Sequence, residues 1–338
     1  MKKTIIWISL LALIPVFVSG SIFPKTGTAA MQFLKLGVDA RAIGMGEAYT
    51  AVTNDISSVY WNPAGLALQN KKQMFISHTK YVADINQEFV ATSMPMNFGT
   101  IALYSSVLHM EDQDITDEDT FGPTGETFSF SNIEAGITYS NMFTDKFSLG
   151  VTAKFIRENA ADEDENGFAV DLGTLYNTKW HNTIIGMALK NFGPDVKYKV
   201  DNDSDGKTDE DPFDLLDNDG DGLIDEDRKE LGYKIPMNYS LGLSSEITKD
   251  LTVSGQLDNC VDRSETWNVG AEYRINVFAL RTGYHIGQDA QGLTAGFGVK
   301  LPLSFAIINV DYAYTSMGDL EESFGDSAHR VSLKLAFK

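Results

Sequence analysis

Two runs of alternating aspartates have the spacing that most directly indicates chemistry in this 338-residue chain. DNDSDGKTDED at 201–211 and DNDGDGLIDED at 217–227 are two copies, offset by sixteen residues. Calcium prefers hard oxygen ligands, and alternate carboxylates around a tight glycine turn can point inward at one ion, as in an EF-hand-like loop. The copies therefore predict a structural Ca²⁺ site formed by Asp201, Asp203, Asp205, Asp209, Asp217, Asp219, Asp221 and Asp225.

Position 12 of each copy departs from the EF-hand pattern, because Pro212 and Arg228 stand where a bidentate glutamate would close the site. No flanking helices are evident, so the copies look more like the calcium repeats of secreted proteins than like a sensor. The alternative is a solvated acidic loop. The acids that could complete the coordination are Glu210, Asp211, Glu226 and Asp227.

Other signals of chemistry are weak. The single Cys260 excludes an intramolecular disulfide and offers neither a metal cluster nor a redox pair. The five histidines show no metal-binding spacing, and the chain has neither a nucleophile elbow nor a phosphate-binding loop, so no enzyme is predicted. The formal net charge of −20 argues against a nucleic-acid partner, which requires basic patches.

The first twenty residues read as a secretory signal peptide. Lys2 and Lys3 precede an apolar run from Ile5 to Val18, and small residues follow at 18–20. That run is too short for a transmembrane helix, and no later stretch approaches the roughly 20 apolar residues that one requires. Any insertion of the mature chain into a membrane must therefore use strands.

From residue 73 onward, apolar and polar residues alternate with the period of two that predicts β-strands. At 147–155, for example, Phe, Leu, Val, Ala and Phe alternate with Ser, Gly, Thr and Lys. The segments are long enough for a tilted bilayer crossing. About fourteen strands are predicted, near 73–82, 86–95, 98–110, 128–142, 146–157, 167–179, 183–192, 237–247, 250–260, 265–275, 277–287, 291–301, 304–314 and 328–337.

The connections alternate in length. Those after the even-numbered strands are tight, whereas most of the others are long and acidic, as at 111–127, 158–166, 193–236 and 315–327. Outer-membrane barrels show this asymmetry, with the long loops outside the cell. Composition agrees, because 29 Gly, 11% aromatic residues, nine Pro and a mean hydropathy of −0.15 suit many strands joined by short turns.

Alternation does not say which face meets lipid, since a soluble barrel would hide the same apolar face inside. About fourteen strands enclose a lumen too wide for the side chains of the wall to fill, so a polar interior holding water or a plug is favoured over a secreted all-β protein. The polar face would place charges in the lumen, where they could pair with one another or with the plug: Lys154, Glu272, Arg274, Arg281, Lys300 and Asp311.

Residues 21–72 lack the strand alternation and are the predicted plug, or hatch. The stretches 29–36 and 40–52 are rich in Ala, Met, Leu and Gly, and Asp55 could cap a short helix through Tyr60 before Pro63 ends it. Glycines 44 and 46 do not fit a dinucleotide loop. We interpret them as allowing close packing in the lumen.

The segment GVDARAIGMGEAYTAVTNDISSVYWNPAGLA at 37–67 resembles the N-terminal region of PorV/PorQ-type proteins, a branch of the FadL-like outer-membrane superfamily. The matching parts are DARA at 39–42, GMGEA at 44–48, Asp55 and WNPAGL at 61–66. The resemblance implies an all-β transmembrane antiparallel barrel of about fourteen strands at 73–338, with an N-terminal hatch in the lumen. It also implies a hatch motif at Asn62, Pro63, Ala64 and Gly65.

The superfamily contains two kinds of protein, so two functions remain open. The first is type IX protein secretion or docking of secreted cargo proteins at the cell surface. The alternative is FadL-like transport of hydrophobic small molecules. In both cases the expected location is the outer membrane of a diderm bacterium, in contact with its lipid and with the long loops outside.

Overall fold

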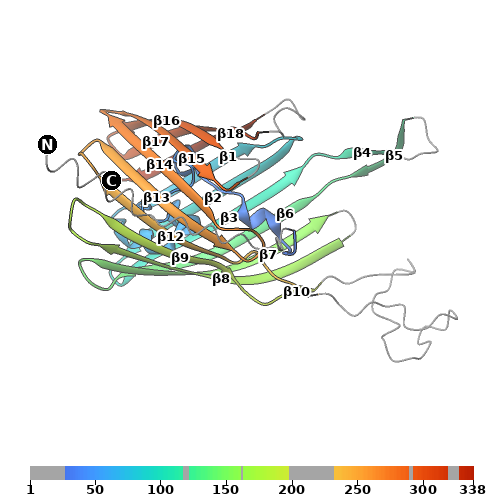
Figure 1. Ribbon diagram of the computed structural model, residues 1–338, viewed down its shortest axis with the longest axis horizontal. Coiled ribbons are helices and arrows are strands. Elements are labelled where there is room, and N and C mark those ends of the chain that lie inside the picture. Colours follow the sequence, from blue (N-terminus) through green and yellow to red (C-terminus); the bar gives the residue numbers. More distant parts are fainter. Residues whose placement is uncertain (1–26, 117–121, 161–162, 198–231, 289–291, 319–326) are drawn as a thin grey trace.

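The computed structural model describes residues 27–116, 122–160, 163–197, 232–288, 292–318 and 327–338. Its main feature is one closed antiparallel barrel, in which each strand pairs with the next wall strand along the chain and β18 pairs with β1 (Figure 1). The fourteen wall strands are β1 (Gln73–Lys80), β2 (Ile85–Met96), β3 (Gly99–Met110), β6 (Ser131–Met142), β7 (Phe147–Ala160), β8 (Glu163–Asn177), β9 (Ile184–Phe192), β12 (Asn238–Glu246), β13 (Leu251–Cys260), β14 (Thr266–Ile275), β15 (Phe278–Ile286), β16 (Leu293–Pro302), β17 (Ala306–Thr315) and β18 (Ala328–Phe337).

The two faces of the wall have opposite polarity. Along β7, Leu149 and Phe155 are exposed on the outside, whereas Ser148, Thr152 and Lys154 are buried on the inside. The same holds around the barrel, because successive side chains of a strand point to opposite faces. An apolar outer face and a polar inner face are the pattern of a transmembrane barrel, which confirms the predicted fold. Exposed apolar residues include Leu172, Met187, Leu241, Val269, Leu280, Phe297, Val310 and Val331.

The predicted strands agree closely with the observed ones, and the largest difference is at β8, which begins at Glu163 instead of 167. Two further pairs were not predicted: β4 (Gln113–Thr116) with β5 (Pro123–Phe128), and β10 (Val196–Lys197) with β11 (Gly232–Tyr233). The sequence pattern predicts only a long acidic connection at 111–127, and most of it forms the first of these pairs. All four β4 residues are exposed, so β4 has no buried face to impose alternation.

The barrel has two distinct ends. At the turn end, the start of β1 pairs with the end of β18, and short connections join strands such as β2 and β3 or β14 and β15. At the opposite, loop end lie the β4–β5 hairpin and the last residues of β7, β9 and β17 (Figure 1). No helix among the described residues is long and apolar enough to cross a membrane.

Residues 29–69, which we call the lumen segment, pack against the inner face of the wall. The segment contains η1 (Gln32–Lys35), α2 (Ala40–Gly44), α3 (Ser58–Trp61) and η2 (Pro63–Leu68). Its buried apolar side chains from Val38 to Leu66 form one cluster with aromatic residues of β1, β2 and β3, and those from Ala30 to Leu34 belong to a second cluster. Members of the first cluster include Ile43, Met45, Tyr49, Ile56, Trp61, Phe75, Phe89 and Tyr104.

Two aspartates shape the turns of the lumen segment. Asp39 caps α2 by accepting a hydrogen bond from the Arg41 backbone N–H at 3.2 Å. Asp55 was expected to cap a helix through Tyr60, but α3 begins only at Ser58. Asp55 instead closes the preceding turn by accepting from the Ser57 N–H at 2.9 Å.

Candidate functional site

Pairs of facing glycines mark the places where the lumen segment touches the wall. A β-carbon added at Gly173 would lie 2.1 Å from Asn62 Oδ1, and one at Gly283 would lie 2.1 Å from the Gly46 backbone nitrogen. Any larger side chain would occupy space that the lumen segment fills. The expected close packing at glycines 44 and 46 therefore exists. The three pairs are Gly150 with Gly173, Gly186 with Gly242, and Gly270 with Gly283.

The motif Asn62-Pro63-Ala64-Gly65 lies at one of these contacts and is fully buried. The Asn62 side chain accepts from the Ala64 N–H at 3.1 Å, and its amide donates to carbonyls of Thr50 and Thr174 at 2.9 and 3.1 Å. Ser148 of β7 donates to the Ala64 carbonyl at 3.1 Å. Asn62 therefore ties together two turns of the lumen segment and β8.

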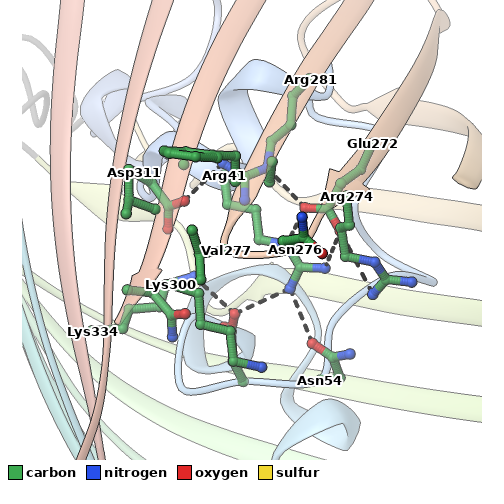
Figure 2. Close-up of a pocket in the computed structure, with 16 residues that line it drawn as sticks. Arg41, Asn54, Glu272, Arg274, Asn276, Val277, Arg281, Lys300, Asp311 and Lys334 are labelled. Carbon is green, nitrogen blue, oxygen red and sulfur yellow. Dashed lines mark hydrogen bonds and ion pairs between the residues drawn. The ribbon is translucent and has the colours of Figure 1, made fainter. Parts of the chain in front are cut away.

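A buried chain of charges joins α2 to the neighbouring strands of the wall (Figure 2). Arg41 donates to both carboxylate oxygens of Glu272, at 2.8 and 2.9 Å. Glu272 also accepts from Arg281 at 2.8 Å, and Arg281 donates to Asp311 at 2.7 Å. Such two-pronged pairing fixes the geometry as well as the charge. The four side chains thereby connect the lumen segment to β14, β15 and β17.

A second ionic contact involves Lys334 of β18. Its ammonium lies 2.6 Å from Asp39 and 2.8 Å from Asp55, and only 3% of its side chain is exposed. Burial acts to raise the pKa of Asp55, but the charges of Lys334 and Arg41 outweigh it and hold that pKa below its ordinary value. We call the contacts of Arg41 with Glu272 and of Lys334 with both aspartates the ionic latch.

The lumen charges noted in the sequence have different surroundings. Lys154 pairs within the wall, at 3.0 Å from Glu134 and 2.8 Å from Asp171. Arg274 lies 3.6 Å from Glu246, whereas the exposed Lys300 has no ion-pair partner among the described residues. Sequence reasoning missed the latch residues of the lumen segment, Asp39 and Arg41, as charge partners. The available signal was the position of both charges within a segment expected to lie inside the barrel.

A cavity of about 290 Å³ lies beside the ionic latch at the turn end (Figure 2). Charged and amide side chains dominate its walls, so it suits water and ions better than a hydrocarbon. Its lining includes Arg41, Asn54, Arg274, Asn276, Lys300 and Lys334.

The eight aspartates of the predicted calcium site lie outside the described residues, as do residues 1–20 of the predicted signal peptide. The described part of the chain holds no group of three or more metal-ligating side chains. Calcium binding therefore stays a prediction. Calorimetry on the full protein is expected to detect Ca²⁺ binding with a Kd of about 10⁻⁴ to 10⁻³ M, lost when Asp203 and Asp219 are both replaced by Ala. No Ca²⁺ heat from the parent up to about 10 mM would leave only the solvated loop.

Comparison with known proteins agrees with this architecture. The structure is similar to the toluene transporter TodX of Pseudomonas putida, with a TM-score of 0.57 at 12% identity over 88% of this chain and 96% of TodX. It is also similar to the CymD monoaromatic hydrocarbon channel, with a TM-score of 0.54 at 12% identity over 89% and 97%. At such identity, these likenesses establish the fold alone.

No curated protein sequence matches the chain. The family model described as type IX secretion system protein PorV matches residues 23–241, which is more than half of the chain and includes the whole lumen segment. With the fourteen-stranded barrel and its packed lumen, this match identifies the chain as a member of the PorV family of type IX secretion system proteins.

Proposed function

We propose that this protein docks secreted cargo at the loop end of an outer-membrane barrel whose lumen segment acts as a fixed hatch. The observation that carries the proposal is the attachment of the lumen segment on opposite sides. Glycine contacts seat it on β7, β8, β14 and β15, and the ionic latch ties it to β14 and β18. A barrel whose lumen is occupied by a firmly attached segment can hold its loops in place at the membrane surface without passing solutes.

The energetics favour a hatch that stays in place. Removing one partner of a buried ion pair costs about 3 to 5 kcal/mol, because the other charge is left unpaired in a medium of low polarity. Withdrawing the lumen segment would break the Arg41 and Lys334 contacts together and expose its apolar cluster. A solute route through the lumen would need a ligand that offsets this cost.

The orientation of the barrel in the membrane determines which end can meet secreted cargo. In outer-membrane barrels, short turns face the periplasm and long loops face the outside. By that rule the β4–β5 hairpin and the connection holding the predicted calcium repeats lie on the cell surface, where secreted proteins emerge.

The second candidate, transport of hydrophobic small molecules, rests on the fold shared with a toluene transporter and a monoaromatic hydrocarbon channel. It would require the lumen segment to move, whereas cargo docking would not. The two proposals therefore differ in one respect: a lumen segment that cannot move would block transport of small molecules but would leave cargo docking intact.

Deletion of the gene is expected to abolish surface display of proteins with a type IX secretion signal while leaving uptake of labelled aromatic hydrocarbons unchanged. Quantitative proteomics of the culture medium and cell surface, with an uptake assay on the same strains, measures both. Complementation by the parent protein is the control. Normal secretion together with reduced uptake would overturn the docking proposal in favour of transport.

A further inference from the structure

Two cavities lie on the loop-end side of the lumen segment, away from the cavity beside the ionic latch. Their volumes are about 130 and 30 Å³, and they share Lys35, Glu47 and Arg263 in their walls. We call them together the loop-end recess. A water molecule occupies about 30 Å³ of liquid volume, so the larger cavity has room for a small organic molecule.

Three charged side chains of the recess form no direct ion pair and no hydrogen bond through their charged groups within the described part of the chain. Lys190 is 8% exposed, and its ammonium lies against aromatic faces, 4.4 Å from the ring centre of Tyr60 and 5.3 Å from that of Trp61. The carboxylates of Asp258, Asp171 and Glu47 attract it only at longer range. The Nε atom of Arg263 is buried without a hydrogen bond. The half-buried Glu47 carboxylate forms neither an ion pair nor a hydrogen bond within the described chain.

The neighbouring charged groups have direct hydrogen-bond or ion-pair partners of their own and contact none of these three directly. Lys35 lies 2.9 Å from Asp262, and Arg330 donates to the hydroxyls of Thr79 and Tyr81. Asp258 accepts from the side chains of Ser240, Gln256 and Asn268. One more buried acceptor, Oδ1 of the 8% exposed Asn238, faces the same recess without a donor.

A buried ammonium or carboxylate without a partner is costly, so a group that completes this shell gains the corresponding free energy. Lys190 and Arg263 can donate hydrogen bonds to a carboxylate. The Glu47 carboxylate and the Asn238 side-chain carbonyl can accept hydrogen bonds from an ammonium group. An anion alone would leave Glu47 without a direct partner, and a cation alone would leave Lys190 and Arg263 without one. We infer that the loop-end recess binds a small zwitterion, an amino acid with one carboxylate and one ammonium group.

This inference concerns the wall and lumen segment and does not depend on the proposed role in secretion. The test is calorimetry on the folded, detergent-solubilised protein with glycine, acetate and methylammonium as probes. Glycine is expected to bind saturably and more tightly than either singly charged probe. Each of Glu47→Gln and Lys190→Met is expected to weaken glycine binding about tenfold or more, the size of one charge-assisted hydrogen bond.

Two controls distinguish binding in the recess from nonspecific effects of removing a charge. Lys249→Met, in an exposed turn at the other end of the barrel, should bind glycine like the parent. Acetate should bind Glu47→Gln at least as well as the parent, because a repelling carboxylate has gone. No saturable heat from glycine up to about 10 mM would mean that the recess holds only water and would overturn the inference. So would acetate binding that equals glycine binding, or unchanged glycine binding in Lys190→Met.

Discussion

Lys334→Met is expected to lower the free energy of unfolding of the barrel in lipid vesicles by about 3 to 5 kcal/mol. The lysine is the ion-pair partner of Asp39, whose side chain is completely buried, and it also contacts Asp55. Methionine preserves much of the side-chain volume while removing the charge. The loss of stability therefore comes mainly from the two carboxylates that lose this cationic partner. Urea titration followed by intrinsic fluorescence measures the free energy of unfolding.

Lys300→Met is the matched control, because Lys300 lines the same cavity but is exposed and unpaired among the described residues. Its effect should stay within about 0.5 kcal/mol, as for other surface substitutions. Adding Asp39→Asn to Lys334→Met should restore part of the lost stability, because the unpaired charge disappears. Equal stabilities of the Lys334 and Lys300 variants would contradict the ionic latch.

The ionic latch also has a pH signature that the same titration can follow. The folded-state pKa of Asp55 lies below its unfolded value of about 3.9, so its contribution is present above that pH and is lost as the pH falls through the folded pKa. Through Asp55 the parent should therefore lose stability below about pH 4. Asp39 partly offsets this loss, because burial raises its pKa against the opposing charge of Lys334. Lys334→Met should lose less over that interval, since the main charge that lowers the Asp55 pKa is gone.

The barrel was predictable from sequence because one physical signal repeats in every wall strand. Lipid outside and a polar lumen inside force apolar and polar residues to alternate along each strand. At the turn end the connections are short, so the end of one strand and the start of the next can be recognised in the sequence. The β4–β5 hairpin escaped prediction for the opposite reason. The hairpin forms a sheet separate from the barrel, and both faces of β4 are exposed, so no environment imposes a period on Gln113–Thr116.

The candidate site was predictable only in part. The motif at 61–66 drew attention to the lumen segment, and the charges of the inner face could be read from alternation. Their partners could not, because Arg41 meets Glu272 and Asp39 meets Lys334 across more than two hundred residues of sequence. Such pairs depend on how the lumen segment is threaded through the barrel, which local patterns do not encode. The same limit hid Glu47, Lys190 and Arg263, which share a recess only in the folded chain.

Gly283→Val is expected to push the lumen segment off the wall and open an ion-conducting path through the barrel. An added β-carbon at this position would lie 2.1 Å from the Gly46 nitrogen and 2.4 Å from the Met45 carbonyl carbon, so backbone would have to move. Valine is favoured in strands, which leaves β15 itself intact. The measurements are single-channel conductance in planar bilayers and the free energy of unfolding, expected to fall by about 3 kcal/mol or more because the clash meets backbone.

Gly255→Val separates the clash from the general effect of replacing a strand glycine. Gly255 lies on the outer face of β13, where an added β-carbon meets no atom within 4 Å. This control should keep the conductance of the parent, because it adds only apolar surface toward lipid. If Gly283→Val also kept the parental conductance while losing stability, the lumen segment would be closing the barrel even when displaced. Equal conductance and equal stability of the two variants would contradict the seating of Gly46 against the Gly270 and Gly283 pair.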